Sequence, residues 1–85
     1  MQKIRQDKNG SIGRNIRRLR LNAKMTQDEV AAKLQLMGCD LSRSAYSQIE
    51  CGTYNIRVRE LSALKRIFQV DYNAFFEGLD DDTKH

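Results

Sequence analysis

The polar side chains between residues 43 and 48 are the group best suited to recognition chemistry. They combine a planar guanidinium, a planar carboxamide and two small hydroxyls, on Arg43, Gln48, Ser44 and Ser47. A guanidinium matches the O6 and N7 acceptors of guanine, a carboxamide matches N6 and N7 of adenine, and a hydroxyl donates or accepts at close range. These residue types therefore favour contacts with base edges in the major groove of DNA.

Groups for catalysis and for metal binding are few. The single histidine is His85, no serine or cysteine has a partner histidine, and no glycine-rich phosphate loop follows a strand pattern. Cys39 and Cys51 have no second pair and no neighbouring histidine, so we expect reduced thiols and neither a zinc site nor a disulfide. We therefore expect a binding module that is not an enzyme and that has no metal and no cofactor.

Charge is distributed unevenly along the 85 residues. Residues 1–66 carry fourteen Lys and Arg against six Asp and Glu, whereas the remaining residues carry one Lys against five acids. This asymmetry indicates that the basic part of the chain faces a polyanion, while the acidic C-terminal part is directed elsewhere. The alternative is that the basic side chains are only solvated. No stretch approaches the roughly 20 apolar residues that span a bilayer, and the polar start lacks the apolar centre of a secretory signal. We therefore expect a cytoplasmic protein without membrane contact.

Helical periodicity begins at residue 12. Apolar residues recur at helical spacing over residues 12–22, which predicts one helix with Ser11 as its cap. The expected stripe consists of Ile12, Ile16, Leu19 and Ala23. Residues 1–10 are polar and aperiodic, so we expect a flexible arm there. The arm carries Lys3, Arg5 and Lys8.

Thr26 and Glu29 give the clearest local signal in the chain. A threonine cap and a glutamate three residues later satisfy each other's backbone N–H groups, so a second helix begins after Thr26. Gly38 can supply the left-handed residue that ends it. The expected buried stripe of this helix consists of Val30, Ala31, Leu34 and Met37.

The third helix is expected over residues 43–51, with Ser42 as its cap and Gly52 at its end. Its apolar stripe is narrow and leaves the polar groups described above on the remaining side. This stripe consists of Ala45, Tyr46 and Ile49, and we assign Tyr46 to packing in preference to base contact.

Two further apolar helices follow a loop at residues 53–57 that is expected to be polar. The stripe of the first consists of Val58, Leu61, Leu64, Ile67 and Phe68. The second is capped by Asp71, with Gly78 near its end, and it carries Tyr72, Phe75, Phe76 and Leu79. Five helices without a strand signal predict an all-α bundle. We expect its domain to span residues 11–79 and residues 80–85 to form a disordered acidic tail.

Three segments together resemble the lambda-repressor-like helix-turn-helix family, which includes phage Cro and repressor proteins and regulators of the xenobiotic-response-element type. The segments are IGRNIRRLRLNAKMTQDEVAAKLQ, LSRSAYSQIECG and RELSALKRIFQVDYNAFFEG. Each segment is loosely defined, but their order and spacing over residues 11–78 are specific. The resemblance implies a five-helix DNA-binding domain whose third helix lies in the major groove while the second helix crosses above it.

The resemblance also implies roles for individual residues. In this family an arginine late in the first helix pairs with a glutamate near the end of the third, which here implies a structural ion pair of Arg20 with Glu50. Gln27 matches a glutamine that the family uses for backbone contact. One departure is the segment at residues 35–40, which is longer than the usual turn. Either the second helix gains a turn before Gly38, or the third helix is displaced and the base contacts shift.

Phosphate contacts orient a protein on DNA, and the first turn of a helix favours an oxyanion because its N–H groups and dipole point there. This places Gln27 among the candidate phosphate contacts. The polar residues after the third helix are candidates for the other flank, namely Tyr54, Asn55, Arg57 and Arg59. Arginines of the first helix would add long-range attraction, namely Arg14, Arg17 and Arg18.

One reading helix covers too few base pairs to define a genomic site, so we expect a homodimer on an inverted repeat, with half-sites about 10 base pairs apart. The aromatic last helix is the candidate dimer surface, unless it only completes the core. The expected function is that of a sequence-specific double-stranded DNA-binding transcriptional regulator of the repressor type. Whether a small-molecule inducer acts on it is not encoded in a recognisable motif. The alternative is a protein-interaction module, antitoxin-like or adaptor, that uses the same bundle.

Overall fold

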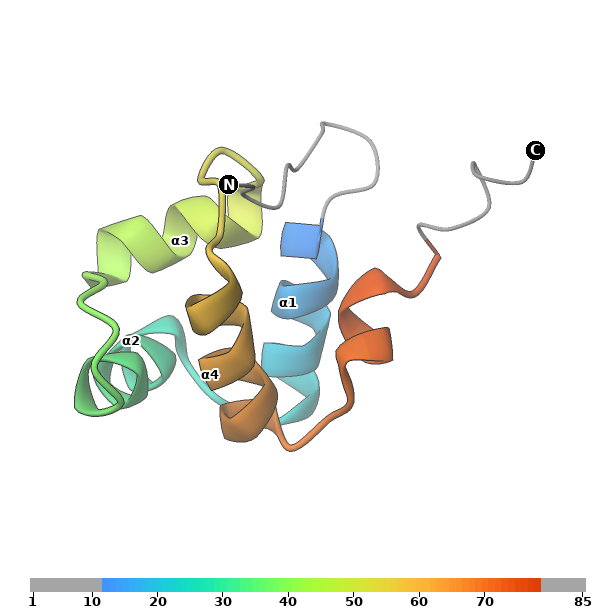
Figure 1. Ribbon diagram of the computed structural model, residues 1–85, viewed down its shortest axis with the longest axis horizontal. Helices are drawn as coiled ribbons and strands as arrows, with labels where there is room; N and C mark the ends of the chain where they lie inside the picture. The colour runs from blue at the N-terminus through green and yellow to red at the C-terminus, as the bar shows by residue number, and fades with distance from the viewer. Residues whose placement is uncertain (1–11, 79–85) are drawn as a thin grey trace.

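The computed structural model describes residues 12–78, which form helices joined by short connections (Figure 1). The four α-helices are α1 (Ile12–Asn22), α2 (Gln27–Leu36), α3 (Arg43–Cys51) and α4 (Val58–Phe68), and a 3₁₀ helix, η1 (Tyr72–Phe76), follows them. No strand occurs within these residues. The prediction of an all-α fold is confirmed, and its fifth helix is a short 3₁₀ helix in place of an α-helix.

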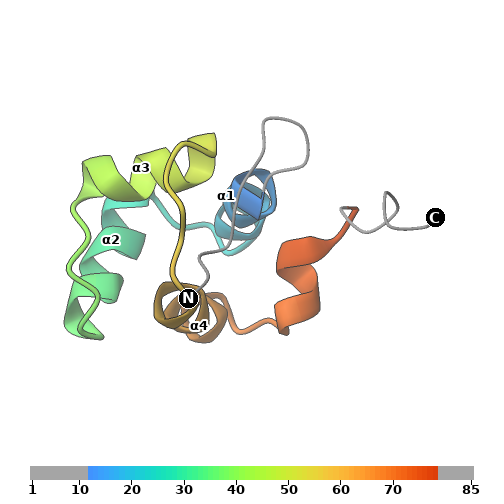
Figure 2. The same ribbon diagram turned by 45° about the horizontal axis from the view of Figure 1, so that its top comes forward.

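The helices surround one apolar core. α1 packs against α3 and η1, while α2 packs against α3 and α4. α3 crosses the top of the molecule in Figure 1, and Figure 2 shows α4 end-on below it, with α1 between α3 and η1. The largest fully buried side chains include Ile16, Leu34, Tyr46, Ile49 and Leu64, so every α-helix contributes to this core.

Hydrogen-bonded caps fix the starts of α2 and α3. Thr26 Oγ1 accepts from the Glu29 N–H at 3.1 Å, and Glu29 Oε1 accepts from the Thr26 N–H at 2.8 Å. Ser42 Oγ accepts from the Ala45 N–H at 3.0 Å. Gly52 ends α3 with a φ of 83°, a conformation that costs glycine little. The predicted caps of both helices are confirmed.

The long connection between α2 and α3 is anchored to the core. α2 extends to the residue before Met37, and Gly38 then turns the chain with a φ of 90°. Gln35 Nε2 donates to Leu41 O at 2.9 Å, and the side chains of Cys39 and Leu41 are buried. α2 therefore ends at the turn that Gly38 makes, and the connection at residues 37–42 is held against the domain by Gln35, Cys39 and Leu41.

Three apolar residues that were predicted to be buried are exposed. Ala23 lies in the turn after α1, Met37 lies just beyond α2, and Val58 is the first residue of α4. Each stands at a helix end, where the chain leaves the core. Ile56, from the loop that was predicted to be polar, is fully buried next to the start of α4.

Asn15 and Arg18 attach η1 to α1. The buried Asn15 side chain donates from Nδ2 to Phe75 O at 2.8 Å and to Glu77 O at 3.0 Å. Arg18 donates from one terminal nitrogen to Glu77 Oε1 at 2.9 Å. Arg18 was expected to add long-range attraction for DNA, but its charge is paired with Glu77, the residue after η1.

The predicted side-chain cap of η1 is wrong. The Asp71 side chain makes no cap hydrogen bond, and its backbone carbonyl accepts from Ala74 N–H. Phe75 completes the core, whereas Tyr72 and Phe76 are 41% and 40% exposed. The remaining predictions for the two ends concern parts of the chain outside the described residues: the arm at 1–10, the cap at Ser11, Leu79 and the tail at 80–85.

Candidate nucleic-acid interface

α3 has a buried side and an outward side. Tyr46 and Ile49 point into the core and are fully buried, and Ala45 is half-buried. The outward side consists of Arg43, Ser44, Ser47 and Gln48, of which only Ser47 is half-buried. The narrow apolar stripe thus fixes the helix on the core and leaves its hydrogen-bonding groups accessible.

The outward side of α3 forms part of one concavity. Gln27, from the first turn of α2, lines this hollow of about 350 Å³ together with Arg43, Ser44, Ser47 and Gln48. The structure therefore brings together all four predicted base-contacting residues and one predicted phosphate-contacting residue. A hollow lined by guanidinium, carboxamide and hydroxyl groups suits a partner that presents hydrogen-bond acceptors and donors at its edges.

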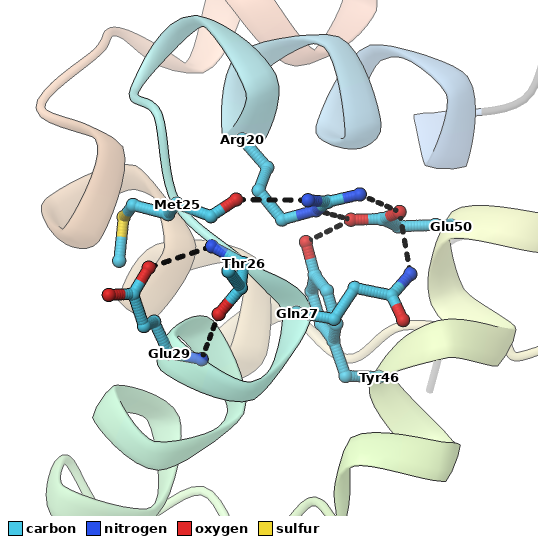
Figure 3. A network of polar contacts seen from close by, with 7 residues as sticks. All are labelled: Arg20, Met25, Thr26, Gln27, Glu29, Tyr46 and Glu50. Atoms are coloured by element: carbon cyan, nitrogen blue, oxygen red, sulfur yellow. Dashed lines mark hydrogen bonds and ion pairs between the residues drawn. The ribbon is translucent and has the colours of Figure 1, made fainter.

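Glu50 joins three helices, and one of its partners is Gln27, which also lines this concavity (Figure 3). Arg20, from α1, donates from Nε to Glu50 Oε2 at 2.6 Å and from a terminal nitrogen to Glu50 Oε1 at 3.1 Å. Gln27 Nε2 donates to Glu50 Oε1 at 3.0 Å, and the buried Tyr46 hydroxyl donates to Glu50 Oε2. Arg20 also donates to Met25 O at 2.9 Å. The ion pair that the resemblance implied is present, and it extends to α2 through Gln27.

The network keeps Glu50 ionised although the carboxylate is buried. Burial alone would raise the pKa of Glu50, but hydrogen bonds from Arg20, Tyr46 and Gln27 outweigh it and hold that pKa below its usual value. Burial and the hydrogen bond to Glu50 raise the pKa of Tyr46. The hydrogen bond to Glu50 likewise raises the pKa of Arg20. At neutral pH the site therefore contains a carboxylate, a guanidinium and a neutral phenol.

Comparison with known proteins matches this arrangement to a family. A family profile described as Helix-turn-helix covers residues 16–75 of the chain. The chain belongs to this helix-turn-helix family. The match confirms the resemblance to the lambda-repressor-like helix-turn-helix family. A comparison with curated proteins finds no match.

A solved structure has the same helix-turn-helix fold. It is the restriction-modification controller protein C.AhdI from Aeromonas hydrophila, with a TM-score of 0.67 and 22% sequence identity. The similarity covers 76% of this chain and 91% of that chain. At this level of identity the similarity establishes the shared fold.

The other predicted phosphate contacts of the helix-turn-helix domain divide into two groups. Asn55 and Arg57 are exposed on the loop that follows α3. The Tyr54 hydroxyl instead donates to Glu60 Oε2 at 3.0 Å, and Arg59 donates to Gly38 O at 3.0 Å. The Arg59 guanidinium therefore lies beside the end of α2 and is not gathered with the outward side of α3.

Asp28 is a residue of the helix-turn-helix surface that the sequence analysis did not single out. Its Oδ1 lies 3.4 Å from Arg43 Nε, and both side chains are exposed. The pair joins the first turns of α2 and α3 at the edge of the concavity. The only signal for it in the sequence is an acid in the first turn of α2, which equally serves the helix dipole.

Residues 12–78 were compared with the arrangements that metal sites and membrane-spanning helices require. No group of three or more His, Cys, Asp or Glu among them is arranged to hold a metal ion. None of their helices combines the length and the apolar character required to cross a bilayer. Cys39 and Cys51 are both free thiols, the first buried and the second exposed.

Proposed function

We propose that this helix-turn-helix protein reads a specific double-stranded DNA sequence with the outward side of α3. The observation that carries the proposal is the concavity in which Arg43, Ser44, Ser47 and Gln48 meet Gln27. The buried side of α3 fixes these groups at the surface of a rigid core, so little ordering of the backbone is needed on binding. The family and the fold of a controller protein support a regulatory role.

In the proposed complex α3 enters the major groove and its side chains contact base edges. Arg43 pairs with O6 and N7 of a guanine, and Gln48 pairs with N6 and N7 of an adenine. Ser44 and Ser47 are short, so they bond only bases that lie directly against the helix. Arg43 must exchange its exposed contact with Asp28 for the guanine, which costs little because such a pair is well solvated.

Phosphates on both sides of the groove would fix the orientation of α3. The N-terminal end of α2 is directed at the backbone through its N–H groups, with Gln27 held in place by Glu50. Asn55 and Arg57 are proposed to contact the backbone at the other end of α3, because both are exposed in the loop that follows it. These contacts position the helix and carry no sequence information themselves.

We further propose a homodimer that binds an inverted repeat and represses transcription by occupying it. A single α3 covers few base pairs, whereas two copies related by a two-fold axis read two half-sites about one helical turn apart. Tyr72 and Phe76 support an interface at η1, because both remain about 40% exposed while Phe75 fills the core. Aromatic side chains are enriched in such interfaces.

Selection of sites from random duplex DNA with the full chain tests this proposal. The expected result is enrichment of an inverted repeat with half-sites about 10 base pairs apart, centre to centre. Affinity for the selected site should fall with salt along a log–log slope of about −5 if six phosphates are neutralised. Selected pools without a common motif, or a nearly flat salt dependence, would contradict the assignment. Repression is then tested with a reporter gene whose promoter contains the selected site, and its expression should fall when the protein is present.

A further inference from the structure

A second surface of the molecule lies away from α3. It is a groove of about 430 Å³ between the C-terminal ends of α2 and α4, both of which lie below α3 in Figure 1. The groove is lined by Lys33, Leu36, Met37, Arg66, Ile67 and Gln69. DNA bound along the outward side of α3 would leave this face uncovered, so the DNA proposal does not explain it.

Three of the six residues that line the groove are apolar, and two of these are exposed to solvent. Leu36 is 86% exposed and Met37 is 37% exposed, and the partly buried Ile67 joins them to the core. A single exposed leucine is ordinary on a protein surface. Three neighbouring aliphatic side chains in one hollow form a contact area that a partner can bury.

The rim of the groove is cationic. Lys33 and Arg66 line it, and the adjoining hollow of about 370 Å³, which shares Met37 and Arg66, adds Arg59. No acidic side chain is among the described residues that line either hollow. An acidic residue, Asp71, lines only a third hollow, together with Lys65 and Arg66, among the hollows described for residues 12–78. The three apolar side chains are therefore bordered by positive charge that an acidic partner would complement.

We propose that this groove binds an acidic amphipathic helix of a second protein. Apolar side chains of that helix cover Leu36 and Met37, and its carboxylates pair with Lys33 and Arg66. Recognition of an amphipathic helix by an apolar groove is a common mode of peptide binding. A nucleic-acid backbone fits less well, because phosphates gain nothing from contact with Leu36, Met37 and Ile67. Since the groove and the outward side of α3 are separate, the partner and DNA would bind the same molecule together.

Selection of peptides from a displayed random library, with the full chain as bait, tests the proposal. The expected peptides carry apolar residues at helical spacing, with Asp and Glu beside them. Leu36→Glu should weaken the selected peptides by at least about tenfold. Lys33→Glu should weaken them by about three- to tenfold. Leu21→Glu and Arg17→Glu, at exposed positions of α1, are the matched controls and should leave binding within about twofold.

The outcomes separate the possible occupants of the groove. Peptides without the acidic amphipathic pattern, failure to select any peptide, or equal binding to Leu36→Glu and wild type would each overturn the proposal. Loss of DNA affinity in Leu36→Glu, with peptide binding intact, would assign the face to nucleic acid. Thermal melts establish that each variant is folded. Failure of the DNA selection leaves this test unaffected, because its readout is peptide binding.

Discussion

Arg20 Nε lies 2.6 Å from Glu50 Oε2, and this contact joins α1 to α3 in the interior of the domain. Both side chains are almost fully buried, at 10% and 2% exposure. Tyr46 and Gln27 supply the remaining donors to Glu50, and no buried side-chain polar atom among residues 12–78 lacks a partner. The orientation of α3 therefore depends on one carboxylate shared by three helices.

Removing one member of this pair should destabilise the fold strongly. Arg20→Met leaves the Glu50 carboxylate buried without its main partner, and we expect a loss of about 3–5 kcal/mol in the free energy of unfolding. The double variant Arg20→Met/Glu50→Leu should recover most of that loss, because no charge remains buried. Urea titrations measure both values. A loss below about 1 kcal/mol in Arg20→Met would show that the pair is not structural.

The same pair predicts a dependence of stability on pH. The pKa of Glu50 is lower in the folded chain than in the unfolded chain, so the folded state binds fewer protons and the ionised form stabilises it. This contribution is complete above the unfolded pKa of about 4.3 and is lost as pH falls toward the lower folded pKa. The difference in unfolding free energy between wild type and Glu50→Gln should therefore be constant above about pH 5.5 and shrink below it. A difference that grows in acid would contradict the pKa direction.

Arg57 and Arg59 should affect DNA binding differently. Arg57 is exposed in the loop that follows α3, directly before α4, so Arg57→Gln should weaken binding to specific and non-specific DNA alike and reduce the salt slope by about 1. Arg59 donates to Gly38 O, so Arg59→Gln should leave DNA affinity within about twofold of wild type. Fluorescence anisotropy at several salt concentrations measures both. If both variants weakened DNA binding equally, Arg59 would contact DNA despite its hydrogen bond to Gly38 O.

Asp28 should oppose DNA binding. Its carboxylate contacts Arg43 and lies at the end of α2 that faces phosphate in the proposed complex. Asp28→Asn releases Arg43 and removes a negative charge, so affinity for selected DNA should rise by about two- to fivefold. Asp71→Asn, the same change at η1, is the control and should have no effect. Weaker binding by Asp28→Asn would mean that the carboxylate orients Arg43 for the base contact.

Local signals in the sequence predicted most of the backbone. Caps at Thr26 and Ser42 and the glycine after α3 depend on neighbouring residues alone, so the bounds of α2 and α3 followed from them. The burial of Ile56 and the exposure of Val58 depend on how the loop after α3 returns to the core. The apolar periodicity of a single helix gives no information about the path of that loop.

The site was predictable to the extent that α3 is amphipathic. Four polar residues on one side of a helix must share a surface once the apolar stripe is buried. The contact of Arg59 with Gly38 and the bond from Gln27 to Glu50 join positions more than twenty residues apart. Such contacts depend on how α2 packs against its neighbours, so they cannot be predicted from residue types alone.

The effect of Arg43→Ala on sequence preference tests the central claim most directly. Binding to every single-base variant of the selected site is measured for wild type and for Arg43→Ala. If Arg43 reads a guanine, the variant should lose about 1–3 kcal/mol, and only the base pair that Arg43 contacts should become degenerate. Unchanged affinity and unchanged preference at every position would contradict the claim that the outward side of α3 reads DNA.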